Sequence, residues 1–235
     1  MIDLDIRPLP WVNGGDGLSA PESGDEGLSM RDAAYQSIKH RILTCALKPG
    51  EYVNEAQLCT MFGAGRTPVR QALERLRLES LVEVIPRKGV IVKSLSLDEV
   101  RQIIEVRLFS ETYSARLAAE RADAGEISQM KELLERARKV LADSNVTQMM
   151  LLDRDFHLML SRATKNVVFS EILQKLHDRS LRFWVISLQT PHHHVRVWEE
   201  HSAIVDAVAD HNLVGAEAAM RAHIESFRAN IVSLL

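Results

Sequence analysis

The 235-residue sequence predicts a mostly α-helical protein in which a small module of helices and a hairpin precedes an all-helical antiparallel bundle. Apolar residues recur at helical spacing through most of the chain after residue 30, and Leu, Ala, Arg and Glu abound while aromatic residues make up only 5%. Two short β-rich runs flank Pro86-Arg87-Lys88-Gly89, which is typical of a hairpin. Beyond residue 94, weak breakers separate long apolar patterns, as in a bundle of six or seven helices with short loops.

Composition and charge divide the chain into three parts. Residues 1–29 hold five of the eleven glycines, lack a periodic apolar pattern and carry a net charge of −5, so we expect a disordered tail there. Residues 30–94 carry eleven basic and six acidic side chains, a net charge of +5, whereas residues 95–235 carry −3. A basic block within an acidic protein favours contact with a polyanion, and a solvated charged face is the alternative.

The composition excludes several classes of protein. The apolar fraction of 46% and the charged fraction of 26% are those of a globular chain rather than a disordered or fibrous one. No apolar run approaches the roughly 18 residues that a membrane span needs. The N-terminus lacks the basic segment and apolar core of a signal peptide, and Cys45 and Cys59 do not make a disulfide framework. We therefore expect a cytoplasmic protein without a membrane partner.

The basic block is expected to fold as helices followed by a hairpin. Arg31–Leu43 has helical apolar spacing, and Asn54 suits the N-cap of a second helix that stops at Gly63. Thr67 is expected to cap a third helix with Pro68 at its first position, where a missing N–H does no harm. The strands are expected over residues 81–85 and 90–92. This order of elements predicts a winged helix-turn-helix over residues 30–94.

The start of the third helix carries side chains suited to reading DNA. In a helix-turn-helix the second helix of the motif enters the major groove, and its N-terminal residues meet the base edges. Arg66 and Arg70 suit bidentate contact with guanine, and the Thr67 hydroxyl at the helix N-terminus suits a phosphate. The hairpin tip adds candidates for contact with the DNA backbone or the minor groove, namely Arg87, Lys88 and Gly89.

A series of residues falls in order on these elements, namely LCTMFG at 58–63, RTPVRQAL at 66–73, and then Leu76 and Leu81-Val82. The series resembles the N-terminal module of GntR-family bacterial transcription regulators. Gly65 stands where that family usually has Ser and Gln71 where it usually has Glu, so no side chain at position 65 can cap the helix or bond a phosphate. The resemblance implies a homodimer that binds a palindromic operator in double-stranded DNA. A winged helix used for protein contacts is the alternative.

Three of the later helices place polar side chains on apolar stripes. Asp153 and His157 lie one turn apart on one helix, and His201 and His223 come from two others. Burying a carboxylate is costly unless it is paired, and one divalent metal would satisfy all of these groups. An Asp with three neutral His suits ions such as Zn, Ni or Mn. The alternative is one or two core histidines hydrogen-bonded to Asp153. Beyond residue 94, the helices that carry these side chains and their neighbours are expected near residues 97–121, 126–143, 147–163, 167–188, 195–210 and 214–234.

Arg107 is a further polar residue on an apolar stripe, with Glu111 one turn on. A guanidinium beside a metal suits the carboxylate of a small organic acid, and an internal salt bridge to Glu111 is the alternative. Asn166 is expected either to bond the same ligand or to cap the following helix. The run His192-His193-His194 looks like a second metal site, but a flexible solvated run is favoured. The remaining histidines, His40, His177 and His211, are interpreted as surface or packing residues.

The motif Asp153-x-x-Phe156-His157, with Asn166, Glu200-His201 and a later His223, is similar to the FCD effector-binding domain of the FadR-type branch of the GntR family. The match covers about residues 97–232. It implies that the Asp and the three His hold a divalent metal, that the metal holds a small carboxylate effector, and that Arg107 lines the effector pocket.

These features predict a transcriptional regulator, by family habit a repressor, whose operator affinity is controlled by a small organic acid at a metal within residues 95–235. A metal-dependent, hydrolase-like enzyme is the second hypothesis, because a metal with open positions can activate water. The lack of a spare general base near the ligands in sequence counts against it. The third hypothesis is a structural metal in a bundle that binds another protein.

Overall fold

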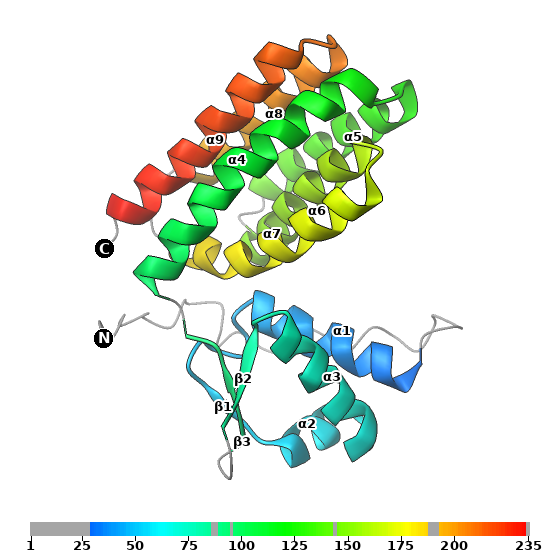
Figure 1. Cartoon of the computed structure of the whole chain (residues 1–235), viewed down its shortest axis with the longest axis vertical. Coiled ribbons are helices and arrows are strands. Elements are labelled where there is room, and N and C mark those ends of the chain that lie inside the picture. Colours follow the sequence, from blue (N-terminus) through cyan, green and yellow to red (C-terminus); the bar gives the residue numbers. More distant parts are fainter. Residues whose placement is uncertain (1–28, 86–88, 95, 143–144, 188–192, 234–235) are drawn as a thin grey trace. The chain divides into compact units, whose positions relative to one another are not determined.

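The computed structural model of the chain describes residues 29–85, 89–94, 96–142, 145–187 and 193–233. These residues form two compact units, one up to residue 95 and one from residue 96 (Figure 1). The first unit combines helices with a small sheet, and the second is helical throughout its described part. Within the described ranges no helix has both the length and the apolar character that a membrane crossing requires.

The first unit is a winged helix-turn-helix, as the sequence predicts. Its described strands form one antiparallel sheet in the order β1-β3-β2, with Tyr52 opposite Ile91 and Val82 opposite Val92. Strand β1 was not expected, because two residues after a Pro-Gly turn are too few to show a period. The bounds are α1 (Met30–Leu43), β1 (Tyr52–Val53), α2 (Glu55–Phe62), α3 (Arg66–Leu78), β2 (Val82–Ile85) and β3 (Gly89–Val92).

The turn between α2 and α3 follows the expected signals at one end and departs from them at the other. Asn54 caps α2 by accepting a hydrogen bond from Ala56 N at 2.8 Å, and Gly63 ends α2 in the left-handed conformation with φ +58°. The prediction that Thr67 caps α3 is wrong. Gly65 occupies the N-cap without a side-chain hydrogen bond, so Pro68 is the third residue of the helix rather than the first. The missing serine hydroxyl therefore leaves α3 uncapped by any side chain.

A polar network joins α1 to the end of α3, and the apolar pattern gives no sign of it. Tyr35 Oη donates to Glu79 Oε1 at 2.6 Å, and Lys39 Nζ donates to Glu79 Oε2 at 2.7 Å and to Tyr35 Oη at 3.0 Å. The guanidinium of Arg75 stacks on the Tyr35 ring, 3.6 Å from its centroid. Tyr35 and Lys39 are both buried, so Glu79 neutralises a cation inside the unit.

The second unit is an antiparallel bundle in which α4 lies beside α9 and packs on α6, while α8 packs on α9 and α5 (Figure 1). Each helix buries one apolar stripe, and Ala115, Phe156, Ile204 and Ile224 lie in the resulting core. The expected helices agree with the observed ones to within about two residues at each end. The bounds are α4 (Leu97–Arg121), α5 (Ala124–Ala142), α6 (Val146–Ala163), α7 (Val167–Ser187), α8 (His193–Ala209) and α9 (Leu213–Ser233).

We expect Glu79→Ala to destabilise the winged unit by about 3 kcal/mol, because it leaves Lys39 as a buried cation without its carboxylate. Chemical denaturation followed by circular dichroism measures this change. The control is Glu74→Ala, which removes an exposed carboxylate from the preceding helix α3 and is expected to leave the stability almost unchanged. Equal losses of stability in the two variants would contradict a stabilising role for the buried network.

Candidate metal centre and nucleic-acid interface

The side chains predicted to be metal ligands lie together inside the bundle. Asp153 and His157 come from α6, His201 from α8 and His223 from α9, and each is buried. One ligand atom of each residue lies within 4.8 Å of those of the others. Asp153 Oδ1 is 3.6 Å from His201 Nε2 and 4.0 Å from His157 Nε2. Side chains from different helices thus converge on one carboxylate.

Two ring nitrogens of this cluster lack a hydrogen-bond partner among the described residues. His157 Nε2 and His201 Nε2 are both shielded from solvent and make no hydrogen bond. Buried polar atoms in native proteins nearly always have a partner, so these atoms indicate that something else binds between them. A carboxylate with three imidazoles is a donor set that divalent transition metals accept, and the residues therefore fit such an ion.

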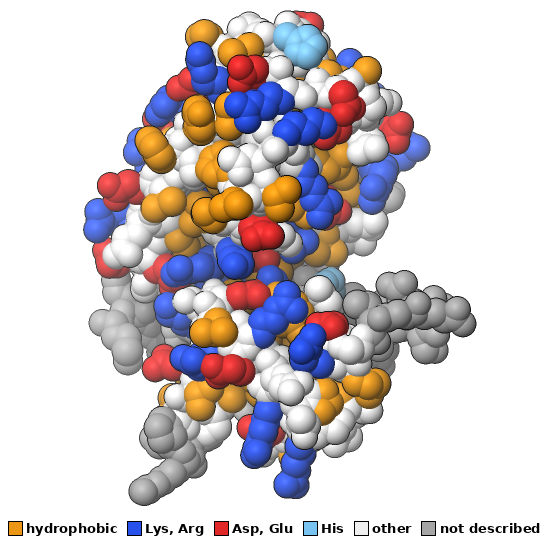
Figure 2. All heavy atoms as spheres, turned by 45° about the vertical axis from the view of Figure 1, so that its right-hand side comes forward, with side chains coloured by type: hydrophobic (Ala, Val, Ile, Leu, Met, Phe, Trp, Pro, Cys, Tyr) orange, Lys and Arg blue, Asp and Glu red, His pale blue; other side chains and the backbone are white. Residues whose placement is uncertain are grey.

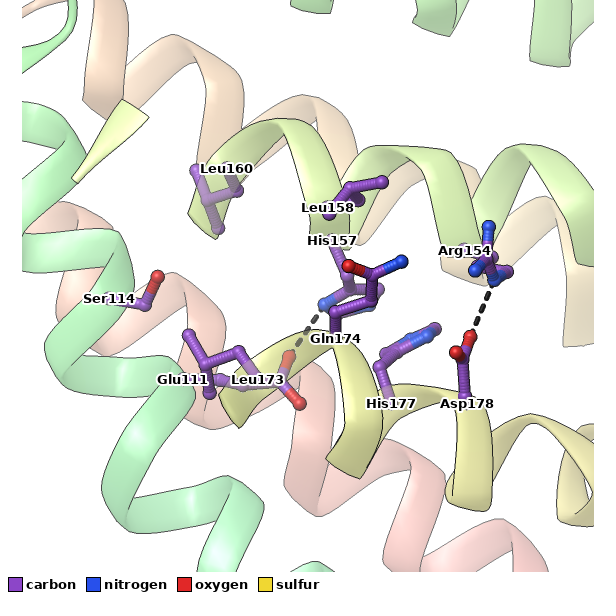
Figure 3. A pocket seen from close by; sticks show the side chains of 10 residues that line it. All are labelled: Glu111, Ser114, Arg154, His157, Leu158, Leu160, Leu173, Gln174, His177 and Asp178. Carbon is purple, nitrogen blue, oxygen red and sulfur yellow. Dashed lines mark hydrogen bonds and ion pairs between the residues drawn. The ribbon is translucent and has the colours of Figure 1, made fainter. Parts of the chain in front are cut away.

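Carboxylates behind two of the imidazoles fix their orientation. Glu111 Oε2 lies 2.6 Å from His157 Nδ1, and Glu200 Oε2 lies 2.8 Å from His223 Nδ1. Because a carboxylate only accepts hydrogen bonds, each Nδ1 carries the proton and each Nε2 keeps its lone pair for another partner. Figure 3 shows Glu111 reaching His157 from the facing helix. These contacts prepare the imidazoles for a metal.

Burial dominates the electrostatics of the centre. It raises the pKa of Asp153, and together with the charges of neighbouring imidazoles it holds the pKa of His201 well below its usual range. Burial also acts to raise the pKa of Glu111, but Arg107 and His157 hold that pKa well below its ordinary value. The neutral form of His201 is therefore favoured, which is the form in which histidine binds a metal.

A further imidazole lies at the centre. His177 on α7 is buried, its Nε2 is 3.5 Å from Asp153 Oδ2, and its ring stacks on that of His157 with the centroids 4.3 Å apart. The sequence interpretation of His177 as a surface or packing residue misses this proximity to the candidate ligands. Leu173 and Leu181, one turn before and after it, are buried, so helical spacing was the available signal.

Arg107 and Asn166, the residues expected to contact an effector, both have partners within the chain. The guanidinium of Arg107 is buried with its Nε 2.5 Å from Glu111 Oε1, which is the internal salt bridge left open as the alternative. The side chain of Asn166 accepts a hydrogen bond from Phe169 N at 3.0 Å at the start of α7, again the alternative. A role of either side chain toward a ligand stays a prediction.

Small cavities adjoin the centre. One of about 30 Å³ is mostly apolar and has Asp153 and His201 in its lining. A cavity of this size holds one or two water molecules, so the space beside the cluster suits a small ligand group. Another, of about 10 Å³, is lined by Leu158, Leu160, Leu173 and the polar side chains of Glu111, Ser114, Arg154, His157, Gln174, His177 and Asp178 (Figure 3).

The run of histidines at positions 192–194 differs from its predicted solvated state. His193, the first residue of α8, is buried, and its Nδ1 lies 3.2 Å from Arg196 Nη2 and 3.3 Å from Asn230 Nδ2. The prediction of a solvated side chain is therefore wrong for His193. His194 is half-buried, and His192 lies outside the described residues. Burial, reinforced by Arg196, lowers the pKa of His193 to about 4.

The predicted base-reading residues lie at the start of α3. Arg66, Thr67 and Arg70 are all exposed, as contact with DNA requires. Arg70 Nε is 2.8 Å from Glu55 Oε2 on α2, an ion pair open to solvent. Figure 2 shows Lys and Arg side chains projecting from the surface of the first unit. Contact of these residues with bases or phosphates stays a prediction.

The predicted hairpin tip is described only in part. Gly89 opens β3 with φ +105°, a conformation that favours glycine. Arg87 and Lys88 lie outside the described residues, as do residues 1–28 with the predicted tail.

Comparison with known proteins places each unit in a family. The family model for bacterial regulatory proteins of the gntR family matches residues 30–92, and the model for the FCD domain matches residues 102–226. The HTH-type transcriptional regulator LutR of Bacillus subtilis (strain 168) is 30% identical over 201 residues, which cover 76% of this chain and 90% of LutR. The HTH-type transcriptional repressor NanR of Klebsiella aerogenes is 30% identical over 205 residues, which cover 77% of this chain and 76% of NanR.

Solved structures share the fold. E. coli McbR/YncC superimposes with a TM-score of 0.78 at 22% identity, over 88% of this chain and 97% of that one. A putative GntR regulator from Rhodococcus sp. RHA1 gives a TM-score of 0.76 at 19% identity, over 88% and 99%. At these identities the likeness concerns the fold alone, an N-terminal winged helix-turn-helix followed by a helical bundle.

We expect His193→Gln to reduce the pH dependence of stability in metal-free protein. The folded pKa of His193, about 4, lies below the usual 6.5, so the unfolded chain binds more protons between these values and stability falls as the pH falls through that window. Between pH 7 and pH 5 the wild type should lose about 1–2 kcal/mol more than the variant, which cannot take up this proton. Urea unfolding at both pH values measures the difference, and parallel losses would contradict the assignment.

Proposed function

This chain belongs to the GntR family of bacterial transcription regulators and carries a C-terminal FCD domain, and on that basis we propose that a divalent metal and a small carboxylate bound in the bundle set its affinity for an operator. It is a DNA-binding regulator, as its relatives are, and not the hydrolase-like enzyme of the second hypothesis. The observation that carries the proposal is the buried cluster of Asp153, His157, His201 and His223. A cytoplasmic repressor remains our expectation.

Asp153, His157, His201 and His223 would hold the metal, and Zn, Ni or Mn suits their donor set. A bound divalent ion supplies positive charge and open coordination positions that attract a carboxylate. The Nε2 atoms of His157 and His201 support this role, since they have no hydrogen-bond partner among the described residues. The neutral state favoured for His201 by burial supports it as well.

Arg107 is the proposed clamp for the effector carboxylate. Its guanidinium is buried in the same interior as the candidate ligands and shares Glu111 with His157. A planar guanidinium binds a carboxylate through parallel hydrogen bonds, so an acid held there would be fixed in orientation. Asn166 is the weaker candidate, because its side chain caps α7.

The first turns of α3 are proposed to read the operator. Arg66 and Arg70 are long, exposed and cationic, and suit the guanine edge in the major groove. Thr67 and the N-terminus of α3, which no side chain caps, suit a phosphate. Gly89, and Arg87 and Lys88 of the predicted hairpin tip, are the further candidates for the DNA backbone.

A homodimer is proposed to present two such helices to a palindromic operator. Apolar side chains on neighbouring helices α4 and α7 are exposed, and the rings of Tyr113 and Phe169 link the two helices with centroids 6.1 Å apart. Figure 2 shows hydrophobic side chains gathered on the bundle surface. Such a patch is uncommon on a monomer and suits a second copy of itself about a twofold axis. Its exposed members are Val106, Phe109, Tyr113, Val167, Val168 and Ile172.

Thermal melting against metals and acids tests the sensor. We expect Zn, Ni or Mn to raise the melting temperature, and one small acid from a panel of hydroxy acids, dicarboxylates and sugar acids to raise it further only when metal is present. At one hundred times its Kd a ligand adds about 2.7 kcal/mol. His201→Gln should lose both responses, while His211→Gln, outside the cluster, should keep them. A metal response without any acid response would favour the structural metal of the third hypothesis.

Arg70→Ala tests the reading helix. Anisotropy titrations against an operator selected by the wild type from random duplexes, and against a scrambled duplex, should show loss of the preference, worth about 1–3 kcal/mol for one bidentate contact. Arg77→Ala, an exposed arginine in the last turn of α3, should weaken both duplexes alike or neither. An unchanged preference in Arg70→Ala would remove Arg70 from the proposed interface.

A further inference from the structure

One carboxylate at the centre serves two partners at once. Glu111 Oε1 lies 2.5 Å from Arg107 Nε, and Glu111 Oε2 lies 2.6 Å from His157 Nδ1. Arg107 is 3% exposed and Glu111 is 4% exposed, so water does not screen these contacts. A single negative charge therefore fixes the tautomer of a candidate metal ligand and balances a buried cation.

The same arrangement recurs on α8, where it is more exposed to solvent. Arg196 Nε lies 3.8 Å from Glu200 Oε1, and Glu200 Oε2 lies 2.8 Å from His223 Nδ1. In both cases the arginine comes four residues before the glutamate on one helix, and the imidazole belongs to another helix. The arginine side chain is 46% exposed on α8. The chain thus contains a solvated counterpart of the buried Arg107–Glu111–His157 arrangement.

We propose that Glu111 is a positioning residue that turns His157 toward the metal and couples the metal to Arg107, so that an anion on Arg107 and the metal bind cooperatively. This inference rests on the proposed metal centre and names how that centre is regulated. Arg107 places a positive charge inside the bundle near a site for a cation, which weakens metal binding. An anion on Arg107 cancels that charge and therefore strengthens metal binding, and by reciprocity the metal strengthens anion binding.

The charge of Arg107 acts on the candidate metal ligands. Burial is the main influence on the pKa of Asp153 and of His201, and the charge of Arg107 acts on both as well. The ring of Phe227 lies on the guanidinium, 5.4 Å from Cζ to the ring centroid, which adds an apolar wall beside the cation. An acid that reached Arg107 would thus replace part of the interaction with Glu111 in a site of low polarity.

Single substitutions of Arg107 and Glu111 distinguish a coupling between metal and anion from a role of the two side chains in supporting the fold. Arg107→Met deletes the cation and leaves Glu111 to His157, so the metal affinity should rise by at least about fivefold. Glu111→Gln keeps a weaker acceptor for His157 but uncovers the charge of Arg107, so the affinity should fall by about 10–100-fold. A pair that only supported the fold would give losses in both variants, because each leaves a buried charge unpaired.

The experiment titrates Co²⁺ alone, without any acid, into the full-length protein and four variants, and follows the visible absorption of the bound ion. The double variant combines Arg107→Met with Glu111→Gln and leaves neither charge of the pair unpaired, so it tests the coupling even where a single variant fails to fold. Its affinity should exceed that of Glu111→Gln. Arg196→Met, the solvated counterpart, should change the affinity by less than about twofold. The Glu111→Gln spectrum should also shift as His157 loses its orientation.

The Co²⁺ titrations test the coupling and the metal centre separately. Tighter binding in Arg107→Met, weaker binding in Glu111→Gln and partial recovery in the double variant would establish the coupling. Unchanged or weaker binding in Arg107→Met, or a double variant no better than Glu111→Gln, would overturn it while leaving the metal centre in place. Absence of any Co²⁺ binding by the wild type would instead contradict the proposed metal centre itself.

Discussion

The burial of one carboxylate, Asp153, is the constraint around which the bundle is organised. A carboxylate in an apolar interior is costly unless other polar groups surround it, and His157, His177 and His201 all approach it within 4.0 Å. These imidazoles in turn need partners, which brings Glu111 and then Arg107 into the interior. Sliding of one helix past another would separate these buried polar groups from one another, a restriction that apolar packing alone would not impose.

Helical spacing was enough to locate the helices and to place Asp153, His157, His201 and His223 on inward stripes, because a period of 3.6 residues is a property of the local chain. The carboxylates behind the imidazoles were not predictable in the same way. Glu111 meets His157 and Glu200 meets His223 only through the register between different helices, which no local pattern records. The burial of His193 was not predictable for a related reason, since its partner Asn230 lies on another helix, α9.

Helix α4 links the interior of the bundle to its surface. Arg107 and Glu111 point inward to the centre, whereas Val106, Phe109 and Tyr113 on the same helix are exposed on the face proposed for a second copy. A ligand that changes the Arg107–Glu111 contact therefore acts on the element that also carries the proposed dimer face. In the proposed dimer, an effector that favours one arrangement of this helix over another would have a route from the interior to the dimer face.

The Arg70–Glu55 ion pair bears on how such a protein would search a genome. Every stretch of DNA offers phosphates, so a freely available arginine adheres everywhere and slows the search. An arginine already engaged by a carboxylate must give up that contact first, at a cost of up to about 1 kcal/mol for an exposed pair. A guanine edge returns more than this through bidentate hydrogen bonds. Arg70 would thus leave Glu55 and add to binding only where its contact on DNA returns more free energy than the ion pair costs.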